Sequence, residues 1–68
     1  MNSHLLTQRE KEIFTMLVDE MSTKEISDIL GISEKTTRNH ISNVIGKLGV
    51  KSRTQAILIL VKNGMLSI

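Results

Sequence analysis

The sequence has no cysteine, no proline, no tryptophan and no tyrosine, and Phe14 is its one aromatic residue. Because cysteine is absent, the chain has no disulfide bond, no thiolate nucleophile and no cysteine ligand for a metal. A chain of 68 residues must then be held together by the packing of its apolar side chains, and it has no room for a deep, enclosed active site. We therefore expect no enzyme, no catalytic residue, no cofactor, no metal and no small-molecule ligand.

Long apolar runs are missing as well. No stretch approaches the roughly 18 consecutive apolar residues of a membrane-spanning helix, and the opening MNSHLL lacks the basic segment and apolar run of a secretory signal. We expect a protein that has no membrane partner and works in the cytoplasm. Because a single aromatic residue offers successive bases no set of side chains to stack on, binding of single-stranded nucleic acid is also disfavoured.

Aliphatic residues recur at spacings of three and four along the chain, which is the period of an amphipathic helix. With no proline and few glycines, the sequence offers strands little support, so the predicted fold class is all-α. Helices are predicted at about residues 8–18, 23–30, 34–48 and 53–63. Residues 1–6 are predicted to form a flexible N-terminal arm, with Leu5 and Leu6 the first residues able to reach the core, and residues 7–66 to form one domain. His4, in the arm, is interpreted as solvated.

Capping signals mark where these helices begin and end. In a capping box, a Ser or Thr before the helix and a Glu or Gln three residues later bond each other's backbone amides. Three such pairs precede apolar runs: Thr7 with Glu10, Ser22 with Glu25, and Ser52 with Gln55. Gly31 and Gly64 are predicted as left-handed helix stops. The first helix is expected to end before Asp19 and Glu20, because these carboxylates would oppose the negative end of its dipole.

Each predicted helix has an inward stripe and an outward face. The inward residues are Ile13, Phe14 and Leu17; Ile26, Ile29 and Leu30; Thr37, His40, Ile41, Val44, Ile45 and Leu48; and Ala56, Ile57, Leu60 and Val61. Leu58 and Ile59 are left on the outer side of the last helix, and two adjacent large aliphatics facing water indicate a partner surface. The alternative, that the C-terminal MLSI folds over them, stays open.

Charge is distributed unevenly along the chain. Residues 1–32 carry a net charge of −3, whereas residues 33–53 carry +4. On the helix in that basic segment, Lys35, Arg38, Asn39 and Ser42 lie opposite the apolar stripe. Cations neutralise phosphate, and guanidinium and amide groups pair with base edges in the DNA major groove. A helix, a glycine turn and a second helix with a basic outer face are typical of a helix-turn-helix.

Two other classes of function are alternatives to DNA binding. A helical protein-interaction module could use the same basic face to bind an acidic partner, and it would be indifferent to DNA sequence. An enzyme is the least supported class. His40 has no Ser or Cys nucleophile with a plausible relay, and we interpret it as packing at the edge of the core.

Four stretches in fixed order, LTQREKEIFTMLV, STKEISDILGIS, EKTTRNHISNVIGKLGV and SRTQA, resemble the LuxR-type DNA-binding domain. This family includes quorum-sensing activators, NarL and FixJ type response regulators and the stand-alone regulator GerE. The resemblance covers Leu6 to Leu66. It implies four helices, with the third in the major groove and the fourth forming a dimer contact on DNA. The implied function is a bacterial transcription regulator that binds double-stranded DNA sequence-specifically, either as a stand-alone GerE-like protein or as the C-terminal output domain of a response regulator.

The resemblance also implies individual site residues. The base-reading positions fall on Arg38, Asn39 and Ser42. The phosphate contacts fall on or near Ser22, Thr23, Lys24, Ser33, Lys35, Thr36, Asn43 and Lys47. The dimer contact falls on Leu58, Ile59 and Lys62. The expected partners are an inverted-repeat DNA operator, a second copy that associates on DNA and only weakly in solution, and RNA polymerase as a further candidate.

A few residues depart from the family's usual pattern. Glu20 stands where a glycine commonly ends the first helix, which predicts a turn without a left-handed residue. Ser27 replaces the usual alanine and Thr37 the usual valine, so two hydroxyls are expected near the crossing of the second and third helices. We expect each hydroxyl to bond a carbonyl one turn back. Gly46 costs its helix about 1 kcal/mol relative to alanine.

Overall fold

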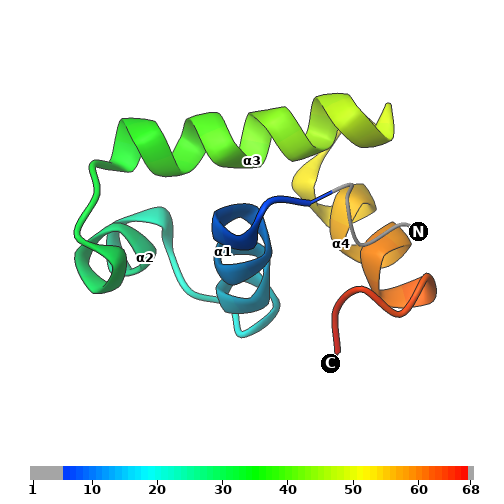
Figure 1. The fold of residues 1–68 in the computed structure, drawn as a ribbon, viewed down its shortest axis with the longest axis horizontal. Coiled ribbons are helices and arrows are strands. Elements are labelled where there is room, and N and C mark those ends of the chain that lie inside the picture. The colour runs from blue at the N-terminus through cyan, green and yellow to red at the C-terminus, as the bar shows by residue number, and fades with distance from the viewer. Residues whose placement is uncertain (1–5, 68) are drawn as a thin grey trace.

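A computed structural model describes residues 6–67, which form four α-helices and no strand. The helices are α1 (Gln8–Val18), α2 (Thr23–Leu30), α3 (Glu34–Leu48) and α4 (Arg53–Lys62). Figure 1 shows α3 extended along one side of the molecule, with α1, α2 and α4 beneath it. The all-α prediction and the helix positions are confirmed, although α4 ends one residue earlier than predicted, with Asn63 as its cap. Within the described part, no helix is long and apolar enough to cross a membrane.

Two of the three predicted capping boxes are present. Thr7 Oγ1 accepts the Glu10 amide at 3.1 Å while Glu10 Oε1 accepts the Thr7 amide at 2.9 Å, and Ser22 and Glu25 bond in the same reciprocal way. The third box is wrong. Ser52 does cap α4, but the Gln55 side chain accepts the backbone N–H of Lys51, at 2.8 Å, instead of that of Ser52. The Gln55 side chain thus reaches one residue further back than a capping box requires, and it fixes the turn before α4 at Lys51.

The turn after α1 also differs from its prediction. Glu20 has a φ of 64°, so a left-handed residue is present although the sequence has no glycine there. The hydrogen bonds explain why: the Met21 amide donates to the Met16 carbonyl at 3.2 Å, which is the 6→1 bond of a Schellman turn. That bond requires a left-handed residue just before its donor, and the chain adopts this backbone even with a side chain at that position.

This strain leads to a testable prediction. Glu20→Gly should raise the free energy of unfolding by about 0.5–1 kcal/mol, because relief of the left-handed penalty exceeds the backbone entropy that glycine adds to the unfolded chain. The Tm should rise by a few degrees in a thermal melt followed by circular dichroism. Glu20→Gln is the matched control, because it removes the charge and keeps the strain. Equal Tm gains in the two variants would assign the effect to charge alone.

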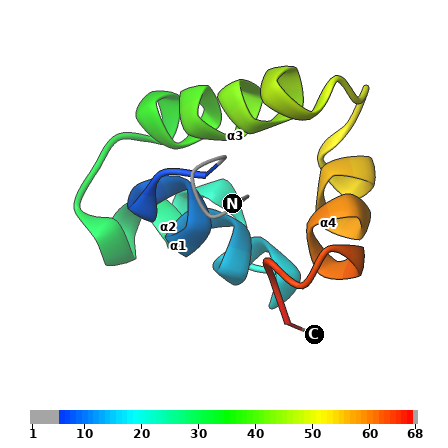
Figure 2. The ribbon, with the colours of Figure 1, turned by 45° about the vertical axis from the view of Figure 1, so that its right-hand side comes forward.

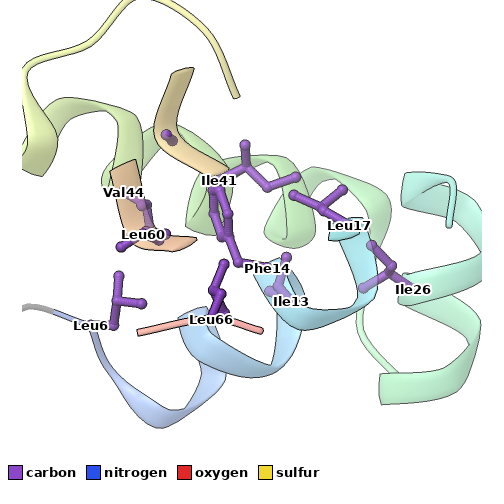
Figure 3. Close-up of a cluster of buried hydrophobic side chains, with 10 residues drawn as sticks. Leu6, Ile13, Phe14, Leu17, Ile26, Ile41, Val44, Leu60 and Leu66 are labelled. Carbon is purple, nitrogen blue, oxygen red and sulfur yellow. The ribbon is translucent and has the colours of Figure 1, made fainter. Parts of the chain in front are cut away.

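Ten buried aliphatic and aromatic side chains from all four helices and both ends form the core (Figure 3). They are Leu6, Ile13, Phe14, Leu17, Ile26, Ile41, Val44, Ala56, Leu60 and Leu66. Leu6 reaches the core as expected, while His4, Leu5 and the rest of residues 1–5 lie outside the described residues. His40, at the edge of the stripe, is half-buried.

The prediction that Ile29 faces inward is wrong. Its side chain is 58% exposed, whereas Ile26 and Ser27 are buried and Leu30 is half-buried. At about 100° per residue, positions 26, 27 and 30 share one arc, and position 29 lies to its side. The burial of Ser27, which a hydrophobic pattern does not count, rotates the inward face of α2 away from Ile29.

The C-terminal tail turns back into the core instead of covering the outer side of α4. The Met65 and Leu66 amides both donate to the Leu60 carbonyl, at 2.8 and 3.2 Å, and Leu66 is buried. Leu58 remains 57% exposed. This resolves the alternative left open by the sequence: the described part of the tail does not cover Leu58.

Candidate nucleic-acid interface

The outward face of α3 is a continuous polar face that the fold leaves uncovered. Thr37, Ile41 and Val44 are buried on the inward side, and Figures 1 and 2 show no other described element over the opposite side. All of the predicted contact residues on this helix are exposed: Lys35, Thr36, Arg38, Asn39, Ser42, Asn43 and Lys47. A 15-residue helix is roughly 22 Å long, which suits the major groove.

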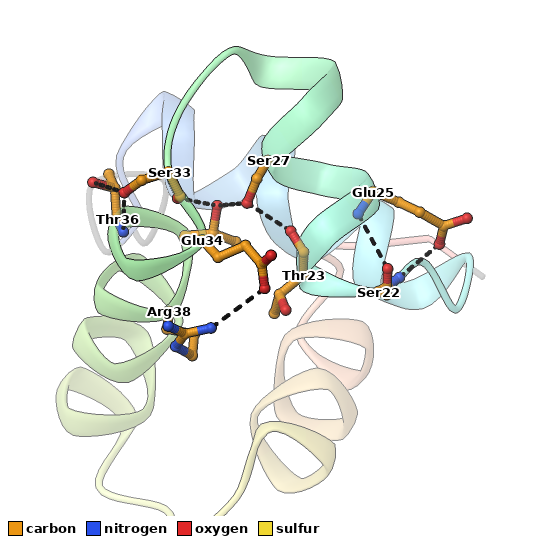
Figure 4. Close-up of polar contacts among 9 residues, drawn as sticks. Ser22, Thr23, Glu25, Ser27, Ser33, Glu34, Thr36 and Arg38 are labelled. Atoms are coloured by element: carbon orange, nitrogen blue, oxygen red, sulfur yellow. Dashed lines mark hydrogen bonds and ion pairs between the residues drawn. The ribbon is translucent and has the colours of Figure 1, made fainter.

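Arg38 is held by an ion pair on the protein's surface. Its Nη1 lies 3.5 Å from Glu34 Oε1, one helical turn earlier, and the two side chains are 56% and 46% exposed (Figure 4). Exposed pairs of this i,i+4 type contribute only about 0.3–0.5 kcal/mol. The guanidinium can therefore leave Glu34 for a base edge at little cost.

The first turns of α2 and α3 carry the remaining predicted phosphate contacts. Ser22 Oγ accepts the Glu25 amide at 3.1 Å, and Ser33 Oγ accepts the Thr36 amide at 3.0 Å. The Ser22 hydroxyl still has its own proton to donate, whereas the Ser33 hydroxyl donates its proton to Thr36 Oγ1 at 3.0 Å. Lys24 pairs with Asp28 at 3.5 Å in an exposed position. Amides, hydroxyls and cations at helix N-termini together favour an anion such as phosphate.

Ser27 and Thr37 connect the two helices behind this surface. Ser27 Oγ lies 2.6 Å from the Thr23 carbonyl, and Thr37 Oγ1 lies 3.1 Å from the Ser33 carbonyl, so the predicted bonds one turn back are confirmed. The two hydroxyls also lie 2.8 Å apart. Because two protons serve three contacts, one contact lacks its own proton at any moment. This unpredicted bridge ties the middle of α2 to the first turn of α3 (Figure 4).

Lys47 makes a contact that sequence reasoning missed. Its Nζ donates to Glu10 Oε1 at 2.6 Å, and the Glu10 side chain is only 4% exposed. Burial raises the pKa of Glu10, but the bonds from Lys47 and from the Thr7 backbone more than offset it and leave the pKa lowered overall. The signal was present in the sequence, because the spacing that turns Ile13 and Phe14 inward turns Glu10 inward too.

The outer side of α4 forms a shallow groove of about 610 Å³ with a mainly apolar lining. Its lining residues come from α4 and from the turn before it: Gly49, Val50, Lys51, Gln55, Leu58, Ile59 and Lys62. Ile59 is half-buried, whereas Leu58 and Lys62 are exposed. The structure thus places the three predicted dimer residues in one groove.

The glycine turn between α2 and α3 and the exposed basic face of α3 define a helix-turn-helix DNA-binding domain. The sequence matches the family described as bacterial regulatory proteins, luxR family, over residues 4–60. The chain therefore belongs to the luxR family, a family of transcription regulators, and the LuxR-type resemblance is confirmed.

Individual relatives agree with this assignment. The chain is 56% identical over 64 residues to the spore germination protein GerE of Bacillus subtilis, covering 94% of this chain and 86% of that protein. It is 43% identical over 65 residues to the transcriptional regulatory protein DegU of Brevibacillus brevis, of which it spans only 28%. A solved structure of the transcription factor GerE matches with a TM-score of 0.91 and 65% identity, covering 93% of this chain and 94% of that one. The protein is thus a GerE-like transcription regulator.

Proposed function

We propose that the protein binds double-stranded DNA sequence-specifically, with α3 in the major groove and two copies joined through α4 on an inverted repeat. The observation that supports this most is the division of α3 into a buried apolar side and an exposed side with cations, amides and hydroxyls. An inserted helix needs both, because one side must be held rigidly while the other meets phosphates and bases. The proposed site of action is the cytoplasm, and RNA polymerase is a further proposed partner.

Base reading is assigned to Arg38, Asn39 and Ser42. They are exposed on successive turns of α3, where a guanidinium can pair with guanine and an amide with adenine. Phosphate contacts are assigned to the first turns of α2 and α3 and to the outer side of α3: Ser22, Thr23, Lys24, Ser33, Lys35, Thr36, Asn43 and Lys47. An ammonium has three N–H donors, so the bond from Lys47 to Glu10 is compatible with a phosphate contact.

Selection of bound duplexes from a random library tests the proposal. We expect enrichment of an inverted repeat with fixed spacing between half-sites, because a two-fold dimer presents the same α3 face twice. Recovery of unrelated sequences with equal affinity would contradict it. That outcome would favour a basic module that binds an acidic partner.

Dimerisation through α4 is tested by Leu58→Asn. Since Leu58 is 57% exposed, the variant should remain folded, with a Tm near that of the wild type, and should bind a single half-site normally. A buried amide without hydrogen-bond partners at the contact should abolish cooperative binding to the full site, because contact between copies held together on DNA supplies the cooperativity. Gel-shift titrations of half and full sites measure this. Ile29→Asn, the same kind of change at a 58% exposed side chain of α2 outside the groove, is the control, and cooperativity equal to wild type in Leu58→Asn would reject the α4 contact.

A further inference from the structure

The outer face of α4 combines an apolar groove with positive charge that no acidic residue balances. Lys51 and Lys62 line the groove together with Leu58 and Ile59. Residues 35–68 contain six Lys or Arg and no Asp or Glu. The protein's acidic residues all precede this segment, so none comes from α4 or from the turn before it.

These cations are also unneutralised by tertiary contacts. In the part of the chain that the structure describes, the ion pairs engage Arg9, Lys24, Arg38 and Lys47. Neither of the groove lysines takes part in one, and Arg53, at the start of α4, is exposed without one as well. The charge around the groove therefore acts on whatever approaches it.

We propose that this charge gates self-association: repulsion between two α4 faces keeps the free protein monomeric, and DNA removes that repulsion when it binds both copies. The inference rests on the proposed function, in which a second copy occupies the groove. Leu58 protrudes beside the groove that it helps to line. One patch thus offers both the projecting side chain and the recess that a two-fold contact requires.

A second copy brings its own lysines to the same contact. Four ammonium groups then surround one small apolar interface with no carboxylate among them. At low ionic strength, where the Debye length is about 30 Å, such charges repel across the whole contact, whereas at about 1 M salt the length falls to about 3 Å. DNA phosphates supply the missing negative charge when both copies are bound.

The consequence is that salt acts in opposite directions on the two assemblies. Binding to DNA weakens as salt rises, because neutralised phosphates have released their counterions. Self-association without DNA strengthens as salt rises, because the repulsion is screened. A dimer held by ion pairs across its interface would instead weaken with salt.

Sedimentation equilibrium of the protein without DNA, at about 20 mM and about 500 mM NaCl, tests the gate. The dimer association constant of the wild type should rise at least about five-fold with salt. Lys51→Gln/Lys62→Gln should associate more tightly than the wild type at low salt and lose most of that salt dependence. Arg9→Gln/Lys11→Gln removes the same charge from α1, away from the groove and from the proposed DNA contacts, and should behave like the wild type.

The outcomes separate the gate from the proposed dimer. If Leu58→Asn abolishes self-association while Lys51→Gln/Lys62→Gln leaves both its strength and its salt dependence unchanged, the α4 dimer stands and the charge gate is wrong. Equal effects of the groove and control double variants would also overturn the gate, because net charge alone would explain them. A wild type that stays monomeric at every salt concentration and binds the full site without cooperativity would overturn both, and would leave the groove to a different partner.

Discussion

Ile41→Ala is expected to lower the free energy of unfolding by about 2–4 kcal/mol, through lost burial and the cavity left behind. Ile41 is 3% exposed and points from α3 towards the side chains of Phe14 and Leu17 in α1 (Figure 3). A domain of this size has a total stability of about 5 kcal/mol. The Tm should therefore fall by more than about 10 °C.

Thermal melts followed by circular dichroism measure this effect. Ser42→Ala, the next residue on the exposed side of the same helix, is the control and should change stability by less than about 0.5 kcal/mol. A wild-type Tm in Ile41→Ala would mean that the buried and exposed faces of α3 are wrongly assigned. The DNA-contacting face would then be wrong as well.

Lys47→Met is expected to cost about 2–3 kcal/mol at pH 7, because it leaves the buried Glu10 carboxylate without its cation. Breaking a fully buried pair costs more, but the Lys47 side chain is 35% exposed and solvent screens part of the interaction. Lys47→Arg retains the charge and should lose much less. A combined Glu10→Leu/Lys47→Met variant should recover part of the loss, because no buried charge remains.

The same pair makes stability depend on pH. The pKa of Glu10 is lowered in the folded state from an ordinary value of 4.5. The stabilisation that ionised Glu10 gives to the fold is therefore complete above pH 4.5, and it is lost as the pH falls through the lower pKa of the folded state. Urea denaturation at pH 7 and at about pH 3.5 should show the difference between wild type and Lys47→Met shrinking in acid. A difference that is the same at both pH values would show that Lys47 contributes packing alone.

Most of the fold follows from local signals in the sequence. Thr7, Ser22 and Ser52 begin their helices as the pattern of capping residues predicts, and Gly31 and Gly64 adopt the left-handed conformation that glycine allows. Each of these caps and stops depends on a few neighbouring residues, so a short stretch of sequence is enough to predict it.

The mispredicted features depend on residues distant in sequence or on competition between local forces. Glu20 is left-handed because the Schellman bond outweighs the strain on its backbone. The helical period turns Glu10 inward, but its ion pair with Lys47, 37 residues later, has no local signal. Ile29 is exposed while Ser27 is buried against a hydroxyl of the next helix. Polar contacts of this kind are not contained in a hydrophobic pattern or in residue preferences.

The sequence predicts one part of the candidate site, the exposed side of α3, but not the groove beside α4. The exposed side of α3 follows from the period of its apolar residues, and the structure places Arg38, Asn39 and Ser42 on it. The groove beside α4 depends on how the turn at Gly49 packs near Leu58 and Ile59, and no spacing in the sequence defines that. The ion pair of Lys47 with Glu10 likewise depends on how α1 packs against α3, which the sequence pattern does not define.

The most direct test of the central claim, that α3 reads bases, compares the affinities of wild type and Arg38→Ala for the selected duplex and for a scrambled one. Arg38→Ala should weaken binding to the selected duplex by about 1–3 kcal/mol, or roughly 5- to 150-fold, and change binding to the scrambled duplex much less. Lys35→Ala, a proposed phosphate contact, should weaken both duplexes alike and reduce the salt slope by about one unit. If Arg38→Ala is folded and weakens the two duplexes equally, α3 does not read sequence through Arg38.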